Sequence, residues 1–284
     1  MAPSSFLSKT SAAVGSAAIL VLAIQPLSGC GASALGQVAV SLGQSFLGTA
    51  TQNYSEEYGQ DMEVLLQALT TDVMGVGLPT EVLNAIAGRP PISLDVAILR
   101  ETVVDEQSIP TPIPNGTTLH DGGGDPNAGD NLKFSFEAGA PCYIYVISVD
   151  GSGWAQPIFP SPSSPGTNPV AAHRQFTIPE GNEWFFLDQY RGVETVYFMA
   201  SYVPRKDIED MMADLAGRTR PALSRGVARV GEAAVVERGI GGTRAGKAAS
   251  VAASDGSIHA FNPTSFFSEQ GRGDMVITRW FRHE

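Results

Sequence analysis

The stretch CYIYVISVDGSGWAQPIF, at residues 142–159, decides the fold of this 284-residue chain. Residues 142–149 are apolar at almost every position, which is typical of a strand that is buried on both faces. The sequence DGSG at residues 150–153 favours a tight turn, because these residue types adopt turn backbone angles readily. Residues 154–159 then form a short partner strand. The stretch therefore predicts a β-hairpin whose first strand lies in the centre of a sheet.

Short strand patterns continue on both sides of this hairpin. Residues 132–137 alternate between apolar and polar side chains, as expected of a strand with one buried face. Further strand signals occur at residues 92–98, 174–178, 183–187, 195–202, 257–261, 266–267 and 274–281. Residues 105–130 are rich in Pro, Gly and Asp and predict a polar loop. Many short strands separated by turns predict a mainly β fold, an antiparallel, immunoglobulin-like β-sandwich.

Helical patterns precede and follow these strands. Residues 54–74 carry apolar side chains at three-to-four spacing, and residues 79–87 predict a second, short helix. Residues 204–215 predict a third helix. A short N-terminal helical segment beside a β-sandwich makes the expected class α+β overall.

The N-terminus has the parts of an export signal. Lys9 is followed by an apolar run at residues 11–24, which is too short to be a good membrane-spanning helix. Leu27-Ser28-Gly29-Cys30 then resembles the lipobox of bacterial lipoproteins. The resemblance implies that a diacylglycerol is added to the Cys30 thiol, that the chain is cut before it, and that the new amine is acylated. An ordinary signal peptide with a coincidental cysteine, or an uncut anchor, is the alternative.

The residue after the cysteine bears on the membrane to which a lipoprotein is sorted. In Gram-negative lipoproteins an aspartate there commonly means retention in the inner membrane, and this chain has Gly31. The resemblance therefore favours the outer membrane and leaves open which face of it. The expected organisation is a signal peptide (1–29), a tether and helical segment (30–90), a β-sandwich domain (91–204), a helix and Gly/Arg/Ala-rich connector (205–250), and C-terminal strands (251–284).

Five short motifs between residues 92 and 201 resemble the domain-of-unknown-function 4384 family of bacterial envelope proteins. They are GDNLKF at 129–134, CYIYVI at 142–147, DG at 150–151 with IFP at 158–160, FTIP at 176–179, and GVETVYFMAS at 192–201. The family has no agreed enzymatic role and supplies no catalytic residues. The resemblance therefore implies a fold and an envelope setting, and it implies no reaction.

Composition and spacing weigh against several kinds of site. The formal charge of −11 argues against nucleic acid as a partner, because the acidic chain and the phosphate backbone would repel each other. If Cys30 is lipidated, Cys142 has no partner for a disulfide and is expected to pack as a small hydrophobe. The histidines share no short spacing, so we expect no metal site and no cofactor. Residues 241–247 fit the spacing G-x-x-x-x-G-K, but Ala248 replaces the Ser or Thr of a phosphate loop, so a flexible linker is expected.

Exposed aromatic side chains are the best candidates for contact with a partner. Trp154, Trp184, Phe186 and Tyr190 could stack on sugars or anchor a protein interface, although core packing is the alternative for each. Residues 184–186 cannot all face one way on a strand, because side chains alternate between its faces.

The sequence thus predicts a lipid-anchored envelope protein that acts as a non-catalytic binding or assembly module. Its expected partners are the membrane, through the lipid, and an envelope protein or glycan. Two alternatives stay open: an envelope hydrolase, which needs a cleft with paired carboxylates or a Ser/His pair, and a structural subunit of a lipoprotein complex.

Overall fold

The structure, a computed structural model, describes residues 56–104, 107–122, 128–161, 167–188, 190–220 and 233–284. All of these residues belong to one compact unit, Val40–Glu284. The leader, Cys30 and the tether up to residue 55 lie outside the described residues, so the lipidation prediction stays a prediction.

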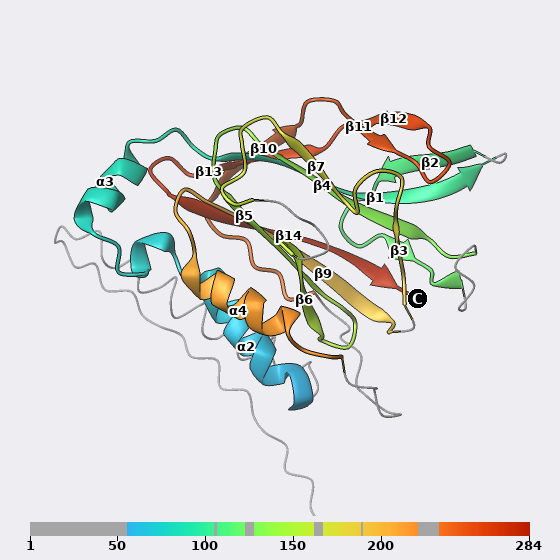
Figure 1. Cartoon of the computed structure of the whole chain (residues 1–284), viewed down its shortest axis with the longest axis horizontal. Helices are drawn as coiled ribbons and strands as arrows, with labels where there is room; N and C mark the ends of the chain where they lie inside the picture. Colours follow the sequence, from blue (N-terminus) through green and yellow to red (C-terminus); the bar gives the residue numbers. More distant parts are fainter. Residues whose placement is uncertain (1–55, 105–106, 123–127, 162–166, 189, 221–232) are drawn as a thin grey trace, which may run out of the picture. The chain divides into compact units, whose positions relative to one another are not determined.

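Two sheets form the body of the protein, which confirms the mainly β fold (Figure 1). Sheet A has the order β10 (Ile240–Ala245), β13 (Thr264–Ser268), β1 (Ser93–Val104), β4 (Asn131–Ala138) and β7 (Gln175–Ile178), with β2 (Gln107–Pro112) beside β1 and β8 (Phe185–Phe186) beside β4. Sheet B has the order β3 (Thr118–Leu119), β14 (Asp274–His283), β9 (Gly192–Ser201), β5 (Tyr143–Val149) and β6 (Ala155–Phe159). All of these pairs are antiparallel except β3 with β14.

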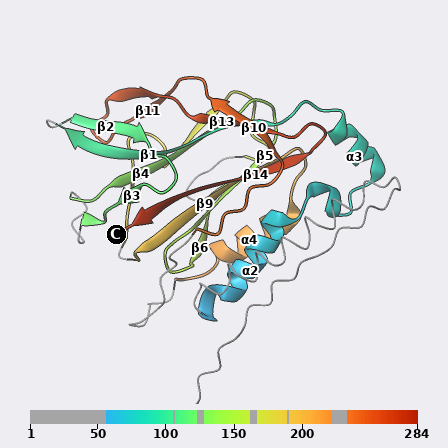
Figure 2. The same cartoon turned by 180° about the vertical axis from the view of Figure 1, so that it is seen from behind.

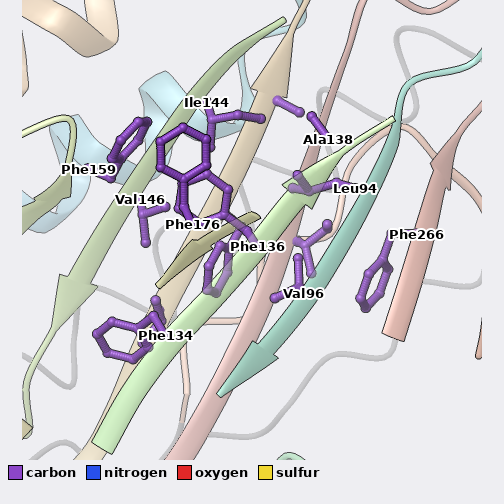
Figure 3. Close-up of a cluster of buried hydrophobic side chains, with 14 of the residues drawn as sticks. Leu94, Val96, Phe134, Phe136, Ala138, Ile144, Val146, Phe159, Phe176 and Phe266 are labelled. Atoms are coloured by element: carbon purple, nitrogen blue, oxygen red, sulfur yellow. The ribbon is translucent and has the colours of Figure 1, made fainter. Parts of the chain in front are cut away.

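The main core lies between the two sheets, as expected of a β-sandwich (Figure 3). It joins alternate side chains of β1 and β4 to those of β5, β9 and β14. Phe136 is its centre, stacked on Phe176 and edge-on to Phe159 with ring centroids 5.0 Å apart in each pair. Such aromatic pairs add about 0.5–1.5 kcal/mol each beyond the burial of their area.

Two helices cover the outer face of sheet B (Figure 1). Helices α2 (Glu56–Thr70) and α4 (Lys206–Ala216) contact each other and pack on the side chains of β5 and β9 that point away from the main core. A 3-10 turn, η1 (Val73–Gly75), and a short helix, α3 (Thr80–Ala87), connect α2 to β1. Within the described ranges, no helix is long and apolar enough to cross a membrane.

A buried ion network fastens α2 to sheet B. Asp274, at the start of β14, accepts from both Arg205 (3.2 Å) and Arg238 (2.6 and 2.8 Å). The same arginines donate to the carbonyl oxygens of Ala68 (2.9 Å) and Leu69 (3.0 Å), at the C-terminal end of α2. Those carbonyls have no partner within a helix, so the two arginines satisfy the helix end and the carboxylate together.

A small hairpin covers part of the outer face of sheet A. Its strands, β11 (Ala249–Ala252) and β12 (Ile258–Phe261), pair only with each other. Val251 and Phe261 pack there on Leu99 of β1 and on Trp184. Both sheets therefore carry apolar side chains on their outer faces as well as in the main core.

The central hairpin agrees with the sequence prediction. Strand β5 lies between β9 and β6, and a turn connects it to β6. Ile144 and Val146 belong to the main core, whereas Tyr145 and Ile147 pack under the helices. Cover on both faces is the reason for the continuous apolar run at residues 142–149.

Three expected boundaries differ from the structure. Residues 241–245 lie in strand β10 rather than a flexible linker, and β2 and β3 lie inside the expected loop 105–130. Both β2 and β10 are edge strands, and edge strands tolerate proline and glycine. Because these residue types are typical of loops, the sequence pattern did not indicate strands there. The sandwich also extends beyond 91–204, because β13 joins sheet A and β14 lies inside sheet B.

Candidate functional site

The four predicted contact residues have different surroundings. Trp184 is 6% exposed and belongs to the cluster under the β11–β12 hairpin, whereas Phe186 is 60% exposed. Tyr190 and Trp154 are half-buried. The Arg220 guanidinium lies 3.3 Å from the centroid of the Tyr190 ring.

The structure therefore does not gather the four aromatics into one exposed patch. Residues 184–186 alternate as expected: Phe185 packs against the main core, and its two neighbours lie outside it. Phe186 alone of the four remains largely exposed and available to a partner.

A cluster of acidic and basic side chains lies at one end of sheet B. Antiparallel pairing sets Gly192 opposite His283, so Glu194 of β9 comes close to the end of β14. The parallel pair of β14 with β3 sets His283 opposite Leu119, and Asp121 follows two residues later. Figure 2 shows the end of β14 close to β3 and β9. Strand register thus assembles side chains from distant parts of the sequence.

His283 and Glu194 form the centre of this acid–base cluster. The Nδ1 atom of His283 lies 3.3 Å from Oε1 of Glu194, and its Nε2 atom lies 3.9 Å from Oδ2 of Asp121. The Gly151 N–H donates to the same Oε1 atom at 3.2 Å. His283 and Glu194 are 2% and 7% exposed, so solvent screens their interaction weakly.

A tight turn after β5 supports the cluster. Oδ1 of Asp150 accepts from the backbone N–H of Ser152 (2.7 Å) and of Trp154 (3.1 Å), which fixes the turn. Position 151 must be glycine, because a side chain there would collide with the carbonyl oxygen of Arg191. The motifs DG and GxE, which lie 43 residues apart, therefore meet in space.

Arginines pair with the outer carboxylates of the cluster. Arg191 donates to both oxygens of Asp121, at 2.9 and 3.1 Å. Arg220 donates to Asp150 and, at 2.6 Å, to Asp188. These pairs leave Glu194 with His283 as its nearest basic group.

Burial changes the acidity of the cluster. It raises the pKa of Glu194 from 4.5 to about 7, and the nearby Asp150 carboxylate adds to the rise. The hydrogen bonds from His283 and from Gly151 N–H lower the pKa in part. Burial also raises the pKa of Asp150, against the hydrogen bond from Ser152 and the charge of Arg220.

The cluster can hold a proton at neutral pH, since one of its carboxyl groups titrates there. A carboxyl group and an imidazole in contact resemble the acid–base pairs of active sites. Both side chains are buried, however, and the described contacts of the pair are internal to the protein. A substrate would reach Glu194 only if the end of sheet B opened.

A buried lysine lies on the outer face of sheet A. Lys133 is fully buried beside the Trp184 ring (4.8 Å to its centroid), and its Nζ donates to the Gly181 carbonyl oxygen at 2.6 Å. Burial lowers its pKa to about 8, whereas the charges of Glu101 and Glu183 raise it. These contacts hold the segment before β8 against sheet A.

A cavity of about 60 Å³ lies over the same sheet. Its polar lining includes Asp95 and Glu137, which face each other on β1 and β4, together with Lys247. This volume has room for a few water molecules and is far below that of an ordinary ligand pocket, about 300–1,000 Å³. Over the described parts of the chain, no group of three or more His, Cys, Asp or Glu side chains is arranged to hold a metal ion.

Sequence reasoning missed the acid–base cluster. The histidines were dismissed because they lie far apart in the sequence, and strand register brings His283 to Glu194 from 89 residues away. One signal was available: Glu194 is the one charged residue in a largely apolar run, residues 193–200. A charged residue in such a run needs a buried partner.

Comparison with known proteins supports part of the motif reading. Residues 127–204 match a family described as "Domain of unknown function (DUF4384)". The match spans β4 to β9 and includes Asp150, Gly151 and Glu194 of the acid–base cluster; His283 and Asp121 lie outside it. No curated protein and no solved structure matches the chain.

Proposed function

We propose that this chain is a lipid-anchored protein of the bacterial outer membrane whose β-sandwich is a non-catalytic binding or assembly module. One observation carries the proposal: Leu27-Ser28-Gly29-Cys30 follows a basic residue and a short apolar run. A thiol at the end of such a run is where a lipoprotein receives its diacylglycerol. The membrane is then the first partner of the protein. The proposal does not specify on which face of the outer membrane the protein lies.

Physical chemistry supports stable anchoring by this route. Each buried CH₂ group contributes about 0.8 kcal/mol, and two or more acyl chains hold a protein far better than one. Gly31 after the cysteine supports the outer membrane as the destination. The surface charge adds no attraction, because an acidic chain is repelled by anionic lipid.

Two observations favour a binding role over catalysis. The acid–base cluster is buried and hydrogen-bonded internally, and the family matched by residues 127–204 is described without an activity. Phe186 is an exposed aromatic on sheet A, where it could contact a protein or a glycan. Nucleic acid is not a proposed partner, because the chain is acidic.

Metabolic labelling with palmitate tests the anchor. The wild-type chain should incorporate the label, lose its leader and sediment with outer membranes. Cys30→Ser should lose the label and keep the leader, whereas the matched variant Cys142→Ser should behave like the wild type. An unlabelled wild type, or a labelled Cys30→Ser variant, would refute the lipid anchor.

Site-specific photocrosslinking in intact cells tests the binding module. A photoreactive amino acid at position 186 should give a discrete adduct with an envelope protein or glycan. Position 258 is the matched control, because Ile258 is 68% exposed and also apolar. Equal adducts at both positions, or none at 186, would count against a partner at Phe186.

A further inference from the structure

The end of β14 carries a buried acid–base pair in addition to its backbone pairing with β9 and β3. Beyond the strand ladder, the described contacts of its last histidine are to carboxylates: Nδ1 of His283 lies 3.3 Å from Glu194, and Nε2 lies 3.9 Å from Asp121. Nε2 makes no hydrogen bond within the described structure, and it is buried. Two backbone hydrogen bonds continue the attachment to β3, from Arg282 N–H to the Thr117 carbonyl (2.8 Å) and from Glu284 N–H to the Leu119 carbonyl (2.9 Å).

The charged groups around the pair come from every neighbouring element. They are Asp121 after β3, Asp150 after β5, Arg191 before β9, Arg220 after α4, and Glu284 after His283. Both arginines are already engaged by the aspartates. Glu194 therefore has neither of these arginines as its own partner, and its basic neighbour is the His283 imidazole.

A proton on Glu194 is thus needed to keep this buried carboxyl group neutral. With that proton in place, Glu194 and His283 stay in hydrogen-bond contact without a buried carboxylate charge. When the proton leaves to solvent, a bare carboxylate stays buried beside Asp150 and Asp121. A buried charge without a partner is destabilised strongly, because the protein interior solvates it poorly.

We propose that Glu194 and His283 form a proton-operated clasp, which fastens the end of β14 to β9 and β3 when Glu194 holds its proton and loosens it when that proton is lost. The inference does not depend on the lipid anchor or on a binding partner. It assigns a regulatory role to a cluster that the family match covers only in part.

The direction of the pH effect follows from Glu194. Its pKa in the folded protein, about 7, is above its ordinary value of 4.5. Protonation therefore favours the closed clasp: the stabilisation is complete below pH 4.5 and is lost as the pH rises through about 7. An envelope domain that meets the external medium would be tightened by acid and loosened by alkali at this one end.

Amide hydrogen exchange on the full-length protein tests the clasp. After correction for the chemical exchange rate, protection of the Arg282 and Glu284 amides should fall by up to about tenfold per pH unit between pH 4.5 and about 7, and should level off above that range. The Ser268 amide, which donates to the Ile92 carbonyl in sheet A, serves as an internal reference and should keep constant protection. A flat profile at the two reporter amides, or an equal fall at Ser268, would overturn the proposal.

Two variants assign the effect to the pair. Glu194→Gln keeps the size and the acceptor for Gly151 N–H but does not titrate, so it should abolish the pH dependence at both reporters. Glu137→Gln is the matched control, because Glu137 lies 3.7 Å from His173 in a partly exposed pair on sheet A; it should leave the profile unchanged. A pH dependence that survives in Glu194→Gln would overturn the assignment. If that variant does not fold, the wild-type profile still decides.

Discussion

The single residues expected to affect the stability of this protein most are charged and buried. Asp274 is fully buried and receives hydrogen bonds from Arg205, Arg238 and the N–H of Val73. The group therefore joins β14, α2 and the chain before α4 in one network. Its removal would leave the Arg238 guanidinium without the carboxylate it pairs with, and would leave buried Arg205 with Asp207 alone.

Asp274→Ala should destabilise the fold by about 3–5 kcal/mol, because the loss of one partner leaves buried charge uncompensated. The free energy of unfolding in urea measures this. Glu269→Ala is the control, since Glu269 pairs with Arg272 in a partly exposed setting, where ion pairs contribute about 0–1 kcal/mol. Similar losses in both variants would contradict the network's role.

Cys142 should be unreactive in the folded protein. Burial raises the pKa of its thiol to about 12, so almost no thiolate forms at neutral pH. A thiol reagent at pH 8 should modify Cys142 only after unfolding. In the same assay Cys30 should stay unreactive throughout if acylated, so two reactive thiols in the unfolded wild type would argue against lipidation.

The sequence predicted single residues unevenly. It predicted Cys142 as a packed hydrophobe, because an isolated cysteine in an apolar run has few other roles. It could not separate buried Trp184 from exposed Phe186, since the covering hairpin β11–β12 lies more than 60 residues away along the chain. Tertiary cover, which no local pattern encodes, decides their exposure.

At the scale of elements, α2 is held by its apolar face. Met62, Leu65, Leu66 and Leu69 are buried against sheet B and α4, while Val64 on the same helix is 52% exposed. The helix therefore depends on packing for its stability, as most protein helices do.

Leu66→Ala should cost about 2–5 kcal/mol of unfolding free energy, because it leaves a cavity under the helix. Val64→Ala is the matched control on the exposed side and should change stability by less than about 0.5 kcal/mol. Thermal and urea unfolding measure both. An equal effect of the two substitutions would show that α2 does not pack on the sandwich as described.

Element predictions succeeded where periodicity was strong. The helices, the β5–β6 hairpin and β14 lie close to their expected positions, because burial on one or both faces leaves a clear apolar pattern. Strands β2 and β10 were missed because edge strands need neither full apolar alternation nor every backbone N–H.

At the scale of the whole molecule, the family-matched segment lacks two interior strands of the sandwich, β1 and β14. Residues 127–204 include β4 and β9, but their neighbours β1 and β14 lie outside the segment. The core between the sheets draws on both missing strands. Full sandwich formation therefore requires chain from both sides of the match.

A fragment of residues 127–204 should not unfold cooperatively, whereas residues 56–284 should show one sharp transition. Near-ultraviolet circular dichroism during urea titration separates the two outcomes. A cooperative transition in the short fragment would mean that the matched segment folds alone and that β1 and β14 are additions to it.

Topology was the least predictable level. Val73 bonds to Asp274 across 201 residues, and β1 pairs with β13 at similar separation. Pattern analysis identified most of the strands but held no information on which strands pair with each other. It left open whether the C-terminal strands join the main sheet: β13 joins sheet A and β14 joins sheet B, whereas β12 pairs with β11 in a separate hairpin.

The cover on both faces of β5 has a cost before folding is complete. Tyr143–Val149 reads YIYVISV, with no charge, proline or glycine to interrupt it. Uncharged segments of six or seven residues with high β propensity self-associate readily when they are exposed. The folded protein protects this segment beneath α2 and α4, but the denatured chain presents it to every other copy. Recovery of native protein from denaturant should therefore improve on dilution, and a chaperone that binds extended apolar segments should help.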